Sequence, residues 1–223
     1  MQYNGAMAYI ELDRSAFFYN LDIIAQQTGS IDKIALVLKD NAYGHGLTEM
    51  AAMAAAYGIR RAVVRTDAEA LAIAHRFDYV LVLADTPKTS SDTVRYTVNT
   101  VEQIARFPKG CRVEIKVDTG MHRNGITVES LDAVFAAAQD AGLKVEGVFT
   151  HQRSADTLSS EWFWQKKRFE TVKRSATELA ERYGFGSLRF HSCNSAALFR
   201  TGAFDEDMAR IGIAAYGFGK LRS

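Results

Sequence analysis

The chain has 223 residues, of which 48% are hydrophobic and 24% are charged. These proportions are ordinary for a globular protein and exclude a collagenous, coiled-coil or disordered chain. Lys and Arg total 27 against 26 for Asp and Glu, so the formal net charge is +1. Such a balance gives no electrostatic reason to expect nucleic acid or an anionic membrane as a partner.

Targeting and metal-binding patterns are missing from the sequence. The N-terminal residues lack the basic and then apolar pattern of a signal peptide, and no stretch reaches the roughly 18 consecutive apolar residues of a membrane span. We therefore expect a cytoplasmic protein without a membrane partner. Cys111 and Cys193 lie far apart and indicate neither a disulfide framework nor a zinc site. The five histidines show no two-histidine metal spacing, so no catalytic metal is expected.

Apolar periodicity alternates helical segments with short strand-like runs along the chain. The first helix is expected to start at Asp13, a good N-cap residue, with Phe17, Leu21 and Ile24 on one face. Further helices are predicted over residues 47–57, 67–75, 127–141, 160–183 and 196–199, with a short one from Val101. Strands are predicted over residues 33–38, 62–64, 79–83, 95–98, 112–117, 145–149, 188–190 and 210–216.

Eight strands that alternate with helices predict an α/β fold, a closed (β/α)8 barrel of the TIM type. The alternation begins with a helix and ends with a strand, so the first helix is expected to take the place of the missing last one. An open, doubly wound sheet is the alternative, but it requires a glycine-rich turn where the sequence has Lys39–Gly46. We expect one barrel domain over residues 13–223, preceded by a segment, residues 1–12, with a short strand from Ala8 to Asp13.

In a (β/α)8 barrel the working residues lie at the carboxyl ends of the strands. Lys39 follows the first strand, where apolar neighbours would partly desolvate its amine and suit it to Schiff-base chemistry. From its position alone, Lys39 is better interpreted as a surface lysine in a glycine-containing loop.

The fifth strand carries Lys116 on the face that it shares with Glu114 and Asp118. Because both faces of a barrel strand are covered, we expect Lys116 to be ion-paired or chemically modified rather than solvated. Asp118-Thr-Gly120 also matches the triplet of aspartic proteases. That chemistry needs two carboxylates that share a proton, whereas the sequence has one copy crowded by basic residues.

Polar residues also follow the last three strands. His151 ends the sixth strand, where an acid/base or ring-contacting role and a purely structural role are about equally consistent with it. Asn194 and Ser195 follow the seventh strand at the start of a short helix, where they could bind an anion or serve only as a helix cap. Gly212 in the eighth strand would let the backbone approach a ligand, and loops after strands seven and eight often hold phosphate in such barrels.

Five segments at the expected strand ends form a recognisable set. They are Lys39-Asp-Asn-Ala-Tyr-Gly-His-Gly46, Lys116-Val-Asp-Thr-Gly-Met-His-Arg123, Thr150-His151 with Ser154-Ala-Asp156, His191-Ser-Cys-Asn-Ser-Ala-Ala197 and Arg210-Ile-Gly-Ile-Ala-Ala-Tyr-Gly217. From about Ala8 to Gly217 the chain resembles the alanine racemase family, whose N-terminal domain is a barrel that binds pyridoxal 5′-phosphate (PLP). It departs from the family pattern at Asp40, where Ala is usual, at Gln152-Arg153, which replace a more apolar pair, and at Ile211, where Pro is usual.

The resemblance implies roles for the site residues. Lys39 would hold PLP as a Schiff base and act as a proton-transfer base. The cofactor phosphate would be bound by Tyr43, Ser195 and the backbone of Gly212 and Ile213, with Asn194 beside them.

The resemblance also assigns four residues to the pyridine ring and the substrate. Arg210 would face the pyridine nitrogen and keep it unprotonated, because a guanidinium cannot accept a proton, and this would limit side reactions such as transamination. Arg123 would bind the substrate carboxylate, and Lys116, carbamylated in many members, would orient it. His151 would belong to a hydrogen-bonded relay to a second base.

The function implied is the interconversion of L- and D-alanine, an isomerase reaction that supplies D-alanine for peptidoglycan, in enzymes that are homodimers. Family members carry a further, mostly β domain with a catalytic tyrosine, and this sequence ends at Ser223, just after the eighth strand. We therefore expect the PLP-binding half of a racemase, impaired on its own. One alternative is a single-domain PLP homeostasis protein without racemase activity, although such proteins lack the Asn-Ala-Tyr-Gly-His-Gly sequence. The other is a barrel enzyme that uses Lys39 on another carbonyl substrate without PLP.

Overall fold

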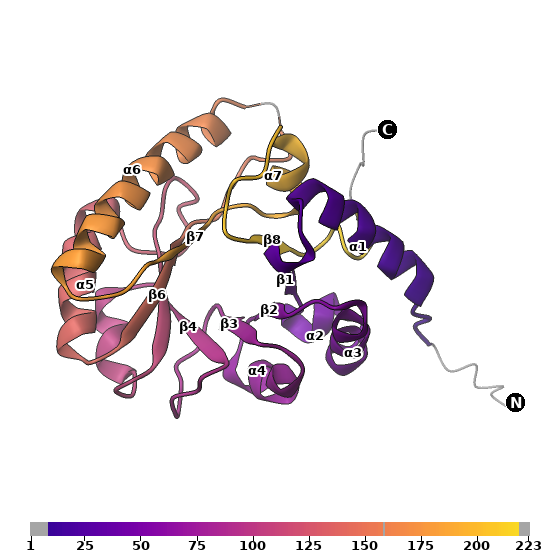
Figure 1. Ribbon diagram of the computed structural model, residues 1–223, viewed down its shortest axis with the longest axis horizontal. Helices are drawn as coiled ribbons and strands as arrows, with labels where there is room; N and C mark the ends of the chain where they lie inside the picture. Colours follow the sequence, from indigo (N-terminus) through magenta and orange to yellow (C-terminus); the bar gives the residue numbers. More distant parts are fainter. Residues whose placement is uncertain (1–8, 158, 219–223) are drawn as a thin grey trace, which may run out of the picture.

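The computed structural model describes residues 9–157 and 159–218 (Figure 1). Within these residues eight strands form one sheet, all of them parallel, in the order β7-β6-β5-β4-β3-β2-β1-β8. The strands are β1 (Ile34–Val37), β2 (Arg61–Val64), β3 (Tyr79–Val82), β4 (Val94–Val98), β5 (Arg112–Lys116), β6 (Lys144–Phe149), β7 (Arg189–His191) and β8 (Ala209–Ile211).

The two end strands of this order, β7 and β8, meet through the residues beside them. Asn194, just beyond β7, forms a parallel bridge with Arg210, and the backbone N–H of Arg210 donates to the carbonyl of Cys193 at 2.9 Å. The Asp207 carboxylate, just before β8, accepts from the backbone N–H of Phe190 at 2.7 Å. The sheet is therefore a nearly closed (β/α)8 barrel, as the alternation of strands and helices predicted, and the open doubly wound alternative is wrong.

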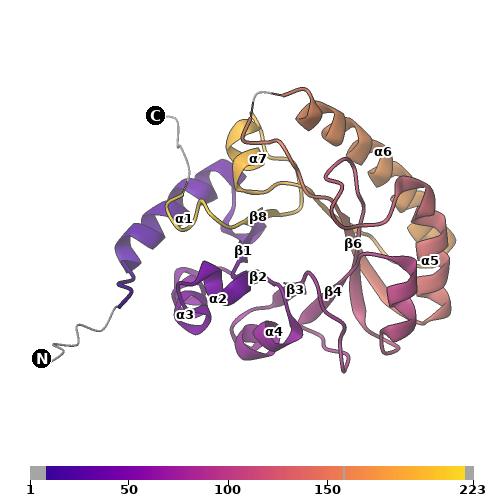
Figure 2. The same ribbon diagram turned by 180° about the vertical axis from the view of Figure 1, so that it is seen from behind.

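Helices cover the outside of this barrel (Figures 1 and 2). They are α1 (Arg14–Thr28), α3 (Leu47–Tyr57), α4 (Asp67–Ile73), α5 (Leu131–Asp140), α6 (Glu161–Arg182) and α7 (Ser195–Arg200), with 3-10 turns at Ile31–Lys33, Ala74–Arg76, Val101–Arg106 and Val128–Ser130. The segment labelled α2 (Lys39–Tyr43) is a short left-handed turn that follows β1. Helices α5 and α6 lie side by side against the β6 side of the barrel. None of the helices within residues 9–157 and 159–218 is long and apolar enough to cross a membrane.

Helix α1 lies beside β1, β8 and α7 (Figure 2), the place that a helix after the eighth strand would take. The Asp13 carboxylate caps it by accepting from the backbone N–H groups of Ser15 and Ala16 at 2.8 and 3.0 Å. Asn20 in α1 donates to the carbonyl of Ala215, beyond β8, at 3.1 Å. The expectation that the first helix replaces the missing last one is therefore confirmed.

Two predicted strands differ from the structure. Tyr9–Asp13 form no strand, and the side chains of Tyr9 and Ile10 are 85% and 66% exposed because these residues pair with no strand of the described chain. The start of that predicted strand at residue 8, like the rest of residues 1–8, lies outside the described residues. Strand β8 ends at Ile211 instead of residue 216, because the following backbone bonds to itself in turns, with the N–H of Ala215 donating to the carbonyl of Gly212 at 2.9 Å.

The strands separate two sets of buried side chains. On β1, Ile34 and Leu36 pack with the helices, whereas Ala35 and Val37 belong to a second, smaller cluster. Because successive side chains of a strand point to opposite faces, this second cluster fills the inside of the barrel. Its members are Ala35, Val37, Val63, Tyr79, Leu81, Phe149 and Met208.

Candidate active site

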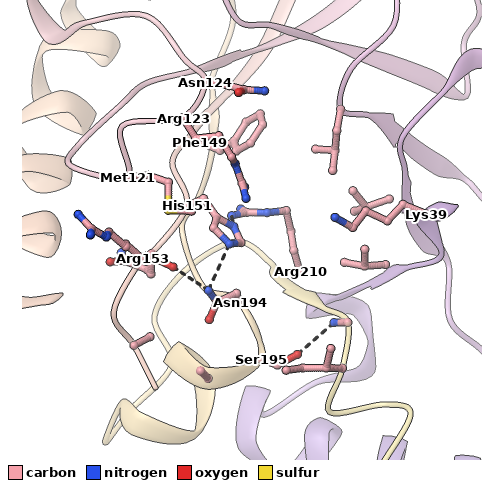
Figure 3. A pocket seen from close by; sticks show the side chains of 18 of the residues that line it. Lys39, Met121, Arg123, Asn124, Phe149, His151, Arg153, Asn194, Ser195 and Arg210 are labelled. Atoms are coloured by element: carbon pink, nitrogen blue, oxygen red, sulfur yellow. Dashed lines mark hydrogen bonds between the residues drawn. The ribbon is translucent and has the colours of Figure 1, made fainter. Parts of the chain in front are cut away.

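A cavity of about 500 Å³ lies at the carboxyl ends of the strands. All the residues that the sequence singled out for a site line it, namely Lys39, Tyr43, Lys116, Arg123, His151, Asn194, Ser195, Arg210, Gly212 and Ile213. Figure 3 shows Lys39 on one side of the cavity, with Arg123, His151 and Arg210 facing it from the other. The fold therefore brings together side chains that are up to about 170 residues apart in the sequence, because parallel strands of a barrel end at one rim.

Lys39 is presented by an unusual turn. Asp40–Tyr43 all have φ between 53° and 57°, the left-handed region, which costs L-residues roughly 1–2 kcal/mol each. The turn is tied down by the backbone N–H of Asn41, which donates to the Glu69 carboxylate at 3.1 Å. As a result the Lys39 amine lies 5.8 Å from the centre of the Tyr43 ring, and both side chains line the cavity.

Arg65 is a cavity residue that the sequence analysis missed. Its guanidinium lies 2.9 Å from the carboxylate of Asp40, which in turn is 4.0 Å from the Lys39 amine. Arg65 directly follows β2, so a search for polar residues after every strand, rather than after five of them, would have found it. The Asp40 substitution noted in the sequence thus places an ion pair beside the cavity lysine.

The corner of the cavity near β8 groups the Ser195 and Tyr43 hydroxyls with the backbone that follows β8. The Ser195 hydroxyl oxygen accepts from the backbone N–H groups of Gly212 and Ala214 at 3.1 and 3.4 Å. A side chain at Gly212 would overlap the Tyr43 hydroxyl, so only glycine allows this close approach. Burial, together with Asp40, raises the pKa of Tyr43 to about 12, which keeps its hydroxyl a donor. Hydroxyl and backbone N–H groups in this arrangement suit a phosphate.

Asn194 caps the N-terminus of α7 beside this corner of the cavity. Its side-chain oxygen accepts from the backbone N–H of Ala197 at 2.9 Å, and its amide donates to the carbonyl of Gln152 at 2.9 Å. The cap holds the start of α7, and with it Ser195, against the loop that follows β6. The structure therefore places Asn194 beside the corner, with its polar groups already engaged.

Lys116 is buried at the cavity wall, with 7% of its surface exposed. Burial and the neighbouring Arg123 and Arg210 cations lower the pKa of Lys116 to about 8. Within the described part of the chain it forms no ion pair, because the Asp118 carboxylate accepts instead from the backbone N–H groups of Gly120 and Met121, at 2.9 and 2.8 Å. The ion-pair alternative expected for Lys116 is therefore wrong, and modification stays a prediction.

His151 is a neutral ring in a cationic setting. Burial, followed by the Arg210 and Arg123 cations, lowers the pKa of His151 to about 3. Its Nδ1 lies 3.5 Å from Nη2 of Arg210, and its Nε2 lies 3.5 Å from the Asn194 amide. The imidazole can therefore accept hydrogen bonds or contact a bound ring, but it is a weak base.

Arg210 is held firmly at the base of the cavity. Nη1 bonds to Nδ1 and the carbonyl of His191, and Nη2 donates to the carbonyls of Thr150 and Ser192 at 2.6 and 3.2 Å. The guanidinium also lies over the Phe149 ring, 5.0 Å from its centre. Its Nε–H has no acceptor among residues 9–157 and 159–218, so Arg210 has one donor left for a ligand.

Among residues 9–157 and 159–218, no group of three or more His, Cys, Asp or Glu side chains is placed to hold a metal ion.

The cavity combines a lysine, an anion corner and a buried guanidinium. Such a set fits a phosphorylated aldehyde that carries a ring nitrogen, because each group has a complementary partner.

Comparison with known proteins agrees with this geometry. The family described as alanine racemase, N-terminal domain, matches residues 12–219. The alanine racemases of Nitratiruptor sp. and Campylobacter curvus are 47% and 38% identical to the chain, over 96% of its length in both cases. The chain spans 64% of the length of each of these two curated relatives.

Solved structures show the same fold. The crystal structure of alanine racemase from Corynebacterium glutamicum matches with a TM-score of 0.79 and 30% identity, over 96% of this chain and 64% of that one. Alanine racemase from Bacillus anthracis, with bound L-Ala-P, matches with a TM-score of 0.80 and 28% identity, over 97% and 60% of the two chains. The sequence match over most of the chain and the shared barrel establish that this chain belongs to the alanine racemase family, as its N-terminal domain.

Proposed function

We propose that this chain binds PLP through Lys39 and forms the cofactor-binding barrel of a PLP-dependent alanine racemase. The observation that carries the proposal is the convergence of Lys39, the Ser195–Gly212 corner and Arg210 in one cavity. Similarity to alanine racemases at up to 47% identity supports the same substrate. An absorbance titration of the purified chain with PLP tests it: a saturable spectral change is expected, and no change at high PLP would contradict the proposal.

Each cavity residue then has a defined task. When bound, PLP supplies an aldehyde that takes up an amino group and a ring that draws electrons from the α-carbon. Lys39 holds the cofactor and moves a proton at the α-carbon. Arg123 binds the substrate carboxylate, and Lys116, in its carbamylated form, orients Arg123. Arg210 donates to the pyridine nitrogen and cannot supply a full proton to it near neutral pH, because a guanidinium stays charged.

His151 acts in this scheme by orientation. With a pKa of about 3 it stays neutral at physiological pH, so it contacts the cofactor ring and accepts hydrogen bonds from Asn194 or Arg210. Its place in a relay to a second base is part of the proposal. We further propose that the enzyme is a cytoplasmic homodimer that supplies D-alanine for peptidoglycan, as its family resemblance implies.

Gly212→Ala is expected to weaken PLP binding by about 10-fold while changing the affinity for unphosphorylated pyridoxal by about twofold or less. The added methyl group would push the Tyr43 hydroxyl out of the phosphate corner. Fluorescence titration with both ligands measures the difference. Gly202→Ala is the matched control, because a methyl group there meets nothing within 4 Å. Equal losses for PLP and pyridoxal would contradict the assignment of this corner to the phosphate.

Lys116 is expected to carry a carbamate when the protein is incubated with bicarbonate near pH 8. Its pKa of about 8 leaves half of the amine neutral at that pH, and only a neutral amine adds CO2. The resulting anion would pair with the neighbouring Arg123, which the ammonium repels. Carbon NMR with ¹³C-labelled bicarbonate should show a carbamate signal that Lys116→Met removes. A wild-type spectrum without that signal would count against the modification.

A further inference from the structure

A fully buried carboxylate, that of Glu114 in β5, lies inside the barrel beneath the cavity. One of its oxygens, Oε1, accepts from the Tyr79 hydroxyl at 2.9 Å and from the Arg189 guanidinium at 2.6 Å. The other, Oε2, lies 2.6 Å from Nε2 of His191. The opposite β6 position is Gly147, where a Cβ would lie 2.9 Å from the Glu114 carboxyl carbon. The barrel interior is therefore shaped around this side chain.

The charge state of Glu114 fixes where the proton of His191 sits. Burial alone would raise the pKa of Glu114, but its bonds to His191, Arg189 and Tyr79 lower it to about 2. An ionised carboxylate can only accept hydrogen bonds, so Nε2 of His191 must carry a proton. Burial lowers the pKa of His191, although Glu114 opposes this, and a neutral ring then has a free lone pair on Nδ1.

The other side of the His191 ring requires the same arrangement. Nδ1 faces Nη1 of Arg210, and a guanidinium has hydrogens to donate but no lone pair to accept with. Glu114 and Arg210, which contact opposite nitrogens of one ring, thus select the same tautomer. The ring itself is stacked on Phe149, with centroids 4.7 Å apart, so it has no freedom to turn over.

We infer that Glu114 is a positioning residue, which fixes His191 with its proton on Nε2 so that Nδ1 holds the Arg210 guanidinium facing the cavity. The functional meaning rests on the proposed function, in which Arg210 meets the pyridine nitrogen of PLP. The arrangement of the three side chains is a property of the chain itself and does not require the cofactor.

Glu114→Gln is the variant that separates this role from simple packing. Because Oε1 accepts from both Tyr79 and Arg189, the glutamine oxygen must stay on that side and its NH2 group must face His191. The proton of His191 should then move to Nδ1, where it opposes an N–H of Arg210. Tyr79→Phe is the matched control, because it removes one bond to the same carboxylate and leaves the oxygen that faces His191 untouched.

The measurement is a long-range ¹H–¹⁵N NMR spectrum of the PLP-free protein, with the His191 signals assigned by their loss in His191→Asn. Wild type and Tyr79→Phe should show a protonated Nε2 and a bare Nδ1, and Glu114→Gln should show the reverse. PLP affinity should fall by about 10-fold in Glu114→Gln and by about twofold or less in Tyr79→Phe.

Two results would overturn the inference. One is a wild-type His191 ring that is protonated on Nδ1 instead of Nε2, or on both nitrogens. This result would overturn the inference even if Glu114→Gln fails to fold. The other is a Tyr79→Phe protein with the same reversed tautomer as Glu114→Gln. Wild-type protein that shows the expected tautomer but binds no PLP would contradict the proposed function and leave the positioning role of Glu114 intact.

Discussion

Lys39→Ala is expected to reduce covalent capture of PLP to background, whereas Lys116→Met is expected to leave it at the wild-type level. Both lysines line the cavity, so the pair tests position rather than the mere presence of an amine. The Lys39 side chain is 32% exposed and lies over the Tyr43 ring, beside the phosphate corner. The Lys116 side chain, in contrast, is buried beside Arg123 and Arg210, so its amine is less accessible to the aldehyde of PLP.

The experiment is borohydride reduction after incubation with PLP, followed by peptide mass spectrometry. One labelled peptide that contains Lys39 is expected in the wild-type protein and in Lys116→Met. Lys39→Ala should still bind PLP without a covalent bond, through the Ser195 and Gly212 corner, so its fluorescence titration shows that the fold is intact. Label on Lys116 or on a surface lysine of the wild-type protein would refute the assignment of Lys39.

The sequence predicts the barrel well because its signals are local and repeated. Asp13 caps the first helix, as its residue type predicted, and α3 ends at Tyr57, as the periodicity predicted. Parallel strands end at one rim, so the residues that follow them converge whatever the details of the helices. This geometric rule is the reason that all ten candidate residues line one cavity.

What the sequence could not predict depends on contacts between distant residues. The apolar run 210–216 predicts one continuous strand, but only tertiary pairing decides that β8 stops at Ile211. The left-handed turn at Asp40–Tyr43 is unfavourable for each residue alone and is stabilised by Glu69 in the first turn of α4. Pattern and periodicity carry no signal for such a bond.

The buried polar network is a second case. The sequence places Glu114 on the same strand face as Lys116, but its partners Tyr79, Arg189 and His191 come from two other strands. Lys116 lies two residues further on the same face, and there the expectation of a carboxylate partner was wrong. Alternation of side chains gives the face of a residue, whereas the identity of its neighbour requires the register of the whole sheet.

When residues 1–223 act on their own with PLP, the rate of deuterium exchange at the α-carbon of D-alanine is expected to exceed the rate of inversion by about 10²–10⁴-fold. Inversion needs a proton removed from one face and returned to the other, and the described residues supply Lys39 for one face. His151, with a pKa of about 3, and Tyr43, with a pKa of about 12, cannot exchange protons efficiently near neutral pH. Lys116, with a pKa of about 8, is the remaining cavity group that titrates in this range.

One incubation of D-alanine in deuterated water decides between these cases when it is followed by NMR for loss of the α-hydrogen and by a chiral assay for L-alanine. Exchange without matching inversion supports a single base, and Lys39→Ala should abolish both. Inversion as fast as exchange would mean that a second base lies within this barrel. If Lys116→Met then lost inversion but kept exchange, Lys116 would be that base. Bound PLP with neither reaction would contradict racemase chemistry in this cavity and favour a PLP carrier, because Lys39 would then hold the cofactor without moving a proton.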